Sequence, residues 1–123
     1  MTAGYVVFAH GSRVEAANQA VRAVAAELAR AGRFDQVEAA FLELGDPDLD
    51  GAVARLALRG VVRIVVIPYF LTLGTHLERD LPRIVADISN HYQNLQIQVT
   101  APLDGHPALV EILLDRAGGS ANT

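Results

Sequence analysis

The sequence predicts a three-layer α/β/α fold built around a four-stranded parallel β-sheet. Apolar runs of strand length alternate with amphipathic helical patterns along the whole chain. That alternation implies parallel strands joined by right-handed crossovers, with helices on both faces of the sheet. The natural strand order for such a doubly wound sheet is 2-1-3-4. With 123 residues the chain has the length of one domain. We therefore expect a single domain over residues 1–117, followed by a flexible C-terminal tail over residues 118–123, GGSANT.

The first strand is predicted at Tyr5–Ala9, where the residues are continuously apolar, as in a strand buried on both faces. After HGSR, an amphipathic helix follows and ends near Gly32. The apolar stripe expected to face the sheet consists of Val14, Ala17, Val21, Val24, Ala25 and Leu28.

The second strand is predicted at Val37–Leu44, with sequence VEAAFLEL. Asp46 and Pro47 then fit the N-cap and first position of a second helix, which ends at Gly60. The residues of this helix expected to point inward are Leu49, Ala52, Val53 and Leu56.

The third strand is predicted at Val61–Ile67, and the chain then restarts as a helix at Thr75, where Thr75 and Glu78 have the spacing of a capping box. Pro82 leaves two alternatives open. Either it kinks a helix that runs on from the first turn, or the main helix begins at Asp80 as N-cap. The apolar face consists of Leu77, Leu81, Ile84, Val85 and Ile88.

A fourth strand is predicted at Leu95–Thr100 and a last helix at Pro107–Arg116. We expect a structural role for His91, which ends the third helix, and for His106, which precedes the last one. The leucine content of the last helix and the small size of the sheet favour a dimer. Its inward residues are predicted to be Leu109, Val110, Leu113 and Leu114.

Composition excludes several classes of function. The net charge is −4 and the chain has neither lysine nor cysteine. An acidic chain without a basic run argues against nucleic acid binding, and the missing lysine argues against Schiff-base and P-loop chemistry. Without cysteine there are no disulfides, thiolate metal ligands or cysteine nucleophiles. No apolar run reaches the roughly 20 residues of a membrane span, and MTAGYVVFA does not resemble a signal peptide, so we expect a cytoplasmic protein.

His10, Glu43 and His76 follow or end the first three predicted strands. In an open α/β sheet the carboxyl ends of parallel strands meet at the edge where ligands bind. Two imidazoles and a carboxylate at one edge predict a site for a divalent transition metal. The alternative is structural, with the histidines as hydrogen-bonded turn residues and Glu43 as the outward residue of a strand end.

Four segments together resemble the short, class II sirohydrochlorin chelatases: AHGSR, AFLELGDPDL, PYFLTLGTHLERDLP and PLDGHPALVEILLDR. The resemblance covers nearly the whole chain. It implies a chelatase-like (flavodoxin-like) domain and insertion of Co2+, Ni2+ or Fe2+ into sirohydrochlorin, on the way to cobalamin, sirohaem or coenzyme F430. It further implies a homodimer, no permanently bound cofactor, and catalytic and metal-binding roles for His10, His76 and Glu43. Many relatives have a histidine-rich stretch, which this chain lacks.

A flat apolar macrocycle needs an apolar wall, and a fringe of carboxylates needs arginines. Ordinary core packing is the alternative for Phe70 and Leu71, and helix capping is the alternative for Ser12. The residues predicted to contact the substrate are Ser12, Arg13, Tyr69, Phe70, Leu71, Leu73, Gly74, Thr75 and Arg79.

Two other functions use the same residues. A metal or tetrapyrrole carrier would bind without turning over. A histidine phosphatase-like phosphoryl-transfer enzyme would use His10 as nucleophile, but such enzymes need an arginine directly before the histidine, where this chain has Ala9. The chelatase is therefore the leading hypothesis.

Overall fold

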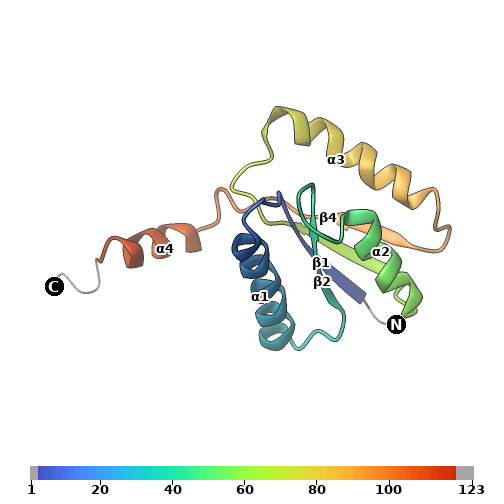
Figure 1. Cartoon of the computed structure of the whole chain (residues 1–123), viewed down its shortest axis with the longest axis horizontal. Helices are drawn as coiled ribbons and strands as arrows, with labels where there is room; N and C mark the ends of the chain where they lie inside the picture. Colours follow the sequence, from blue (N-terminus) through green and yellow to red (C-terminus); the bar gives the residue numbers. More distant parts are fainter. Residues whose placement is uncertain (1–2, 119–123) are drawn as a thin grey trace.

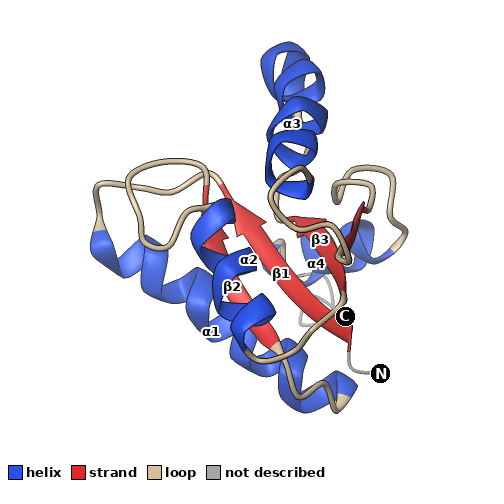
Figure 2. Cartoon of the chain, turned by 90° about the vertical axis from the view of Figure 1, so that its right-hand side faces the viewer, coloured by secondary structure: helices blue, strands red, loops and turns tan. Residues whose placement is uncertain are grey.

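In the computed structural model, which describes residues 3–118, a parallel sheet of four strands carries helices on its two faces (Figures 1 and 2). The strand order is β2-β1-β3-β4, which confirms the predicted fold class. Within these residues no helix has the length and apolar character needed to cross a membrane. The predicted tail lies outside the described residues except for Gly118. The elements are β1 (Ala3–Ala9), α1 (Glu15–Gly32), β2 (Val37–Phe41), α2 (Leu49–Leu58), β3 (Arg63–Pro68), α3 (Gly74–Ser89), β4 (Gln96–Val99) and α4 (Ala108–Arg116).

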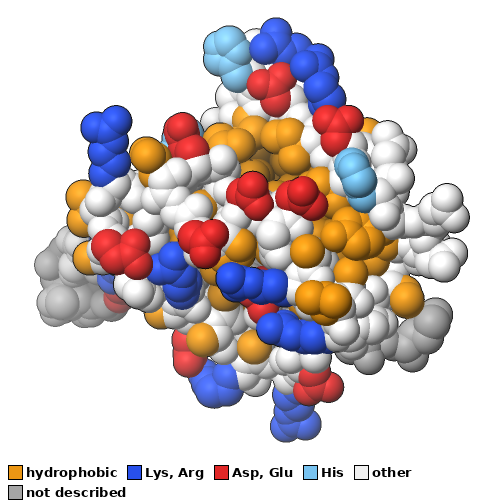
Figure 3. All heavy atoms as spheres, turned by 45° about the vertical axis from the view of Figure 1, so that its right-hand side comes forward, with side chains coloured by type: hydrophobic (Ala, Val, Ile, Leu, Met, Phe, Trp, Pro, Cys, Tyr) orange, Lys and Arg blue, Asp and Glu red, His pale blue; other side chains and the backbone are white. Residues whose placement is uncertain are grey.

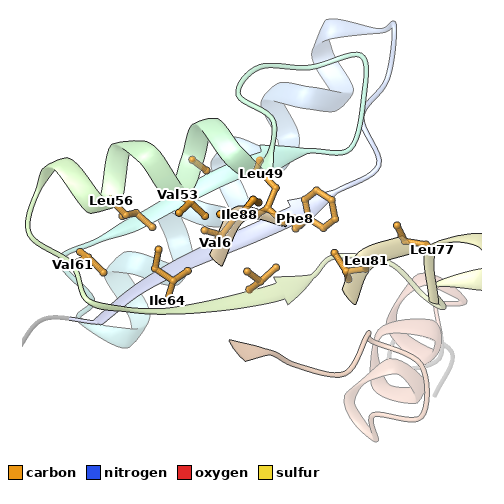
Figure 4. Packing of buried hydrophobic residues seen from close by; sticks show 13 residues of the cluster. Val6, Phe8, Leu49, Val53, Leu56, Val61, Ile64, Leu77, Leu81 and Ile88 are labelled. Carbon is orange, nitrogen blue, oxygen red and sulfur yellow. The ribbon is translucent and has the colours of Figure 1, made fainter. Parts of the chain in front are cut away.

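The larger part of the core lies between the sheet and helices α2 and α3 (Figure 4). Alternate residues of β1 and β3 point to this side, among them Phe8 and Ile64, because successive side chains of a strand point to opposite faces. All four predicted inward residues of α2 are buried here, as are Leu77, Leu81 and Ile88 of α3. The periodicity of both helices was therefore predicted correctly.

Helix α1 packs on the opposite face, against β1 and β2. Its buried stripe passes through Asn18, Val21, Ala25 and Leu28, which are spaced three or four residues apart. The prediction was wrong for Val14, which precedes the helix and is exposed. It was also wrong for Ala17 and Val24, which flank the stripe and are exposed. The first inward position of this stripe is occupied by a polar residue, Asn18, which the apolar pattern did not predict.

Strand β2 is shorter than predicted, since it ends at Phe41 rather than Leu44. The backbone turns away from the strand direction at Leu44, which has φ +57°, and the loop closes where the N–H of Phe41 donates to the carbonyl of Pro47. Helix α2 accordingly begins later than predicted. Its N-cap is Asp48, whose carboxylate accepts the N–H of Gly51, and not Asp46.

Helix α3 runs without a break from Gly74 to Ser89, with Pro82 inside it. Of the two alternatives, the continuous helix is correct, and Asp80 is not an N-cap. The predicted capping box is wrong, because the N-cap is Leu73 and it makes no side-chain capping bond. Leu77 and Leu81 lie four residues apart on one face of the helix, and their burial holds this face against the core near the point where the proline removes a backbone bond.

Helix α4 projects away from the sheet (Figure 1). The preceding segment is attached to the β3–α3 loop, because the N–H groups of Leu103 and Asp104 donate to the carbonyls of Phe70 and Leu71. The prediction that α4 packs inward is therefore wrong. None of its residues is buried, and the exposed fractions are 60% for Val110, 66% for Leu113 and 56% for Leu114, while Leu109 is half-buried.

Candidate active site

Backbone hydrogen bonds connect the chain segments that follow β1, β2 and β3. Leu42 N–H donates to Ala9 O at 2.9 Å, and Glu43 N–H donates to His10 O at 3.1 Å. On the other side of β1, Tyr69 N–H donates to Phe8 O at 2.7 Å. The three strand ends therefore meet at one edge of the sheet, as the sequence predicted.

Gly11 allows the loop after β1 to pass directly against the loop after β2. Its φ of +97° lies in the left-handed region, and a Cβ at this position would lie 1.6 Å from the carbonyl oxygen of Glu43. No residue with a side chain fits there without displacing backbone. This close approach sets the distance between His10 and Glu43.

His10 and Glu43 form a hydrogen bond in which Nε2 of the imidazole lies 3.0 Å from Oε2 of the carboxylate. An ionised carboxylate only accepts, so Nε2 is the donor in this pair, and in the neutral form of the ring the lone pair lies on Nδ1. Both side chains are more than half exposed, at 59% and 56%. Since β2 ends at Phe41, Glu43 lies in a loop and not at the outward position of a strand, and its carboxylate orients the imidazole of His10.

A cavity of about 370 Å3 brings His10 together with His76. Phe70 lines this cavity and also packs edge-on against Phe8, with ring centroids 5.9 Å apart, so the core-packing alternative is correct for this residue and its contact with the substrate stays a prediction. The predicted substrate contacts Leu73, Gly74 and Thr75 also line the cavity. Sequence reasoning missed other lining residues, namely Leu42, Thr72, Leu77, Asp80 and Ile84.

The remaining predicted substrate contacts lie outside the lining of this cavity. Arg79 lies beside it, with Nη2 at 3.4 Å from Nδ1 of His76. Arg13, Tyr69 and Leu71 are exposed, Leu71 to 64%. Ser12 accepts the N–H of Val14 through its hydroxyl just before α1, which makes it a turn residue at the helix start.

Asn18 was missed by sequence reasoning and holds the two site loops together. Its amide nitrogen donates to the carbonyls of Ser12 and Leu44, and its amide oxygen accepts the N–H of Ser12, all at 2.9 Å. The residue is 2% exposed. These bonds join the loop that carries His10 to the loop that carries Glu43. The signal in the sequence that would have identified Asn18 is a polar residue at an inward position of an otherwise apolar helical stripe.

Among residues 3–118 no three histidine, aspartate or glutamate side chains form a group that would hold a metal ion. The predicted set of His10, Glu43 and His76 is therefore not assembled in this structure, and it stays a prediction for the metal-bound protein. The other two histidines make backbone contacts, since His91 Nδ1 lies 2.8 Å from Asp87 O and His106 Nδ1 accepts the N–H of Ala108. This agrees with their predicted structural roles.

A second cavity of about 290 Å3 lies beside the first, and Leu42 and Ile84 line both. Phe8 and Leu49 are among its apolar lining residues, and three carboxylates border it, those of Asp48, Asp50 and Asp87. Figure 3 shows apolar side chains exposed between acidic ones in the upper half of the molecule. The two cavities together offer a longer apolar surface than either one alone.

Comparison with known proteins identifies one family. Residues 4–119 match the family model described as CbiX. A sirohydrochlorin cobaltochelatase of Methanopyrus kandleri is 32% identical, over 90% of this chain and 92% of that protein. A chloroplastic sirohydrochlorin ferrochelatase of Arabidopsis thaliana is 30% identical over 92% of this chain, which spans half of that protein's length.

Solved structures share the fold. A CbiX protein from Marinobacter aquaeolei has a TM-score of 0.83 at 24% identity, with 97% of each chain covered. The sirohydrochlorin chelatase SirB of Bacillus subtilis, solved in complex with cobalt, has a TM-score of 0.89 at 24% identity. The match covers 97% of this chain and 51% of SirB, so the chain spans about half of that protein.

Proposed function

The chain belongs to the CbiX family, and we propose that it is a sirohydrochlorin chelatase, a lyase-type enzyme that inserts a divalent metal ion into this tetrapyrrole. The observation that carries the proposal is the cavity at the carboxyl edge of the sheet, which brings together His10, oriented by Glu43, and His76. Imidazole and carboxylate suit Co2+, Ni2+ and Fe2+ alike. The metal is a substrate, and the expectation that no cofactor is permanently bound stays a prediction.

During insertion, two pyrrole N–H bonds of the tetrapyrrole are replaced by bonds from nitrogen to the metal. The ion loses its waters and binds the pyrrole nitrogens, while two N–H bonds break and their protons pass to bases. The Nδ1 atom of His10 suits this task, because the bond to Glu43 leaves its lone pair free and stabilises the imidazolium that forms.

The tetrapyrrole is proposed to lie along the two adjoining cavities, with its ring against Phe70 and Leu73. Aromatic and aliphatic walls are suited to a planar apolar ring. Arg79 beside His76, and Arg13 in the loop after His10, are the proposed partners of its carboxylates. Tyr69 and Leu71, which are exposed next to this wall, are proposed to contact the edge of the macrocycle.

We further propose that the protein acts as a homodimer, with residues 1–117 of each chain forming one domain. Helix α4 supports this proposal because Val110, Ile112, Leu113 and Leu114 are all at least half exposed. A helix of nine residues has little stability in water without a packed apolar face. The occupant proposed for this face is a second copy of the chain. A cytoplasmic location remains a prediction.

The dimer proposal predicts that Leu113→Glu yields a monomer, because the new carboxylate would be buried in the interface. Leu58→Glu is the matched control, since Leu58 is 88% exposed on α2, and this variant is expected to remain a dimer. Sedimentation velocity of wild type and both variants measures the difference. A monomeric wild type, or a dimeric Leu113→Glu variant, would contradict the role given to α4.

The chelatase proposal is tested by incubating the pure protein with sirohydrochlorin and Co2+, Ni2+ or Fe2+ and following the absorbance change of the tetrapyrrole. We expect insertion well above the rate in buffer for at least one metal. Binding of metal and tetrapyrrole without any acceleration would instead support the carrier hypothesis. Turnover of a phosphate ester with no chelation would revive phosphoryl transfer.

A further inference from the structure

Asp80 is a carboxylate on the α3 side of the active-site cavity, and the fold gives it no capping role. It lines the cavity with His10 and His76, and its side chain is 41% exposed. Helix α3 already begins at Gly74, so Asp80 lies within the helix. Aspartate is a poor residue for a helix interior, because its side chain competes for backbone hydrogen bonds. Its position therefore calls for a reason other than helix stability.

Asp80 follows His76 by four residues, the spacing at which two side chains lie on the same face of a helix. Arg79 connects them. Its Nε donates to Oδ1 of Asp80 at 3.2 Å, and its Nη2 lies 3.4 Å from Nδ1 of His76. A guanidinium only donates, so Nδ1 of His76 is the acceptor in this contact. His76, Arg79 and Asp80 thus form one side-chain group at the cavity.

The β1 side of the cavity has the simpler arrangement, in which His10 donates from Nε2 to Glu43. Histidines that bind metals usually donate their second ring N–H to a carboxylate, which fixes the ring and raises its basicity. We propose that Asp80 is the positioning residue of His76, accepting Nδ1–H when Nε2 of His76 binds the metal. This inference rests on the proposed function and extends it to a residue that sequence reasoning left out of the site.

Arg79 connects the proposed interaction between His76 and Asp80 to binding of the tetrapyrrole. While Arg79 contacts both neighbours, the carboxylate of Asp80 is engaged and Nδ1 of His76 faces a cation. A carboxylate of the bound tetrapyrrole is a strong alternative partner for the guanidinium. Once Arg79 turns to it, Asp80 is free to accept from His76. Co2+ bound at Nε2 of His76 brings about the same interaction without tetrapyrrole, because the ring proton then lies on Nδ1, which donates to Asp80 and no longer accepts from Arg79. Binding of the tetrapyrrole adds to this effect by drawing Arg79 away.

The test compares Asp80→Asn, Asp80→Glu and Asp80→Ala with Glu78→Gln, a control that removes an exposed charge from the same helix outside the cavity lining. Co2+ alone is the first probe, titrated by absorption spectroscopy without tetrapyrrole, and kcat and KM for Co2+ are measured separately. Asp80→Asn and Asp80→Ala are expected to weaken Co2+ binding about 10- to 100-fold. Asp80→Glu is expected to retain most of the affinity, and Glu78→Gln all of it.

Thermal unfolding distinguishes a positioning role from a structural one. Because alanine is the better helix former, Asp80→Ala is expected to keep or raise the midpoint while losing Co2+ affinity. Three results would overturn the inference: Co2+ affinity of Asp80→Asn within about twofold of wild type, unfolding of the Asn and Ala variants, or a wild type that does not bind Co2+. If wild type binds Co2+ but inserts none, the proposed function fails, and the binding data still decide the role of Asp80.

Discussion

Replacing His76 or His10 by alanine is expected to lower kcat/KM for metal insertion roughly 100-fold or more, because each change removes from the cavity an imidazole that binds the metal or accepts a proton. The two histidines lie on separate elements, the β1 end and helix α3, and neither replacement touches the buried core. Both variants are therefore expected to keep the thermal midpoint of wild type. The measurement is the initial rate of tetrapyrrole absorbance change at several metal concentrations.

His91→Ala is the matched control for these variants. His91 is exposed just after α3, where its ring contacts the carbonyl of Asp87, and it lines neither of the two cavities. Its removal is expected to leave kcat/KM within about twofold of wild type, as for an exposed residue away from the site. If His10→Ala or His76→Ala were as active as His91→Ala, the assignment of the cavity as the active site would be wrong.

The replacement Gly11→Ala is expected to reduce the free energy of unfolding by roughly 3 kcal/mol or more, since the methyl group would overlap the carbonyl of Glu43 at a positive φ. Relief of the overlap requires the loops after β1 and β2 to separate. The hydrogen bond between His10 and Glu43 spans these loops, so activity is expected to fall with stability. Urea unfolding measures the stability, and the insertion assay measures the activity.

Gly60→Ala separates the overlap from the effect of backbone conformation. Gly60 has φ +86°, but no atom lies within 4 Å of the position of its Cβ. This variant is expected to lose only about 1 kcal/mol, the usual cost of a left-handed conformation for alanine. Equal losses for Gly11→Ala and Gly60→Ala would show that the loops do not approach as closely as described.

The fold was predictable because its signals are local and repeated. The alternation of apolar runs with amphipathic helices indicated a parallel sheet, and the natural doubly wound order is the one observed. Helices α2 and α3 bury the apolar faces that their periodicity indicated. The meeting of the first three strand ends at one edge followed from the parallel topology, although His10, Glu43 and His76 do not form a metal-binding group there. Prediction failed for elements whose ends depend on contacts between residues that are distant in the sequence. The end of β2 depends on the loop that returns from Pro47 to Phe41, which no local pattern reveals.

The failures at α3 and α4 have separate physical causes. Pro82 has a strong local tendency to end a helix, but burial of Leu77 and Leu81 outweighs it, so Asp80 became a cavity residue instead of an N-cap. The apolar residues of α4 were read as facing their own sheet. The preceding segment instead binds the β3–α3 loop and directs the helix outward. The amphipathic pattern of a helix indicates that its apolar face is covered. It does not indicate which surface covers that face.

The most direct test of the account is the position of Co2+ in crystals of the protein, located by anomalous scattering. The account predicts an ion in the cavity bound by the imidazoles of His10 and His76, at metal–nitrogen distances of about 2.1 Å. Cobalt at His91 or His106 with none in the cavity would contradict it.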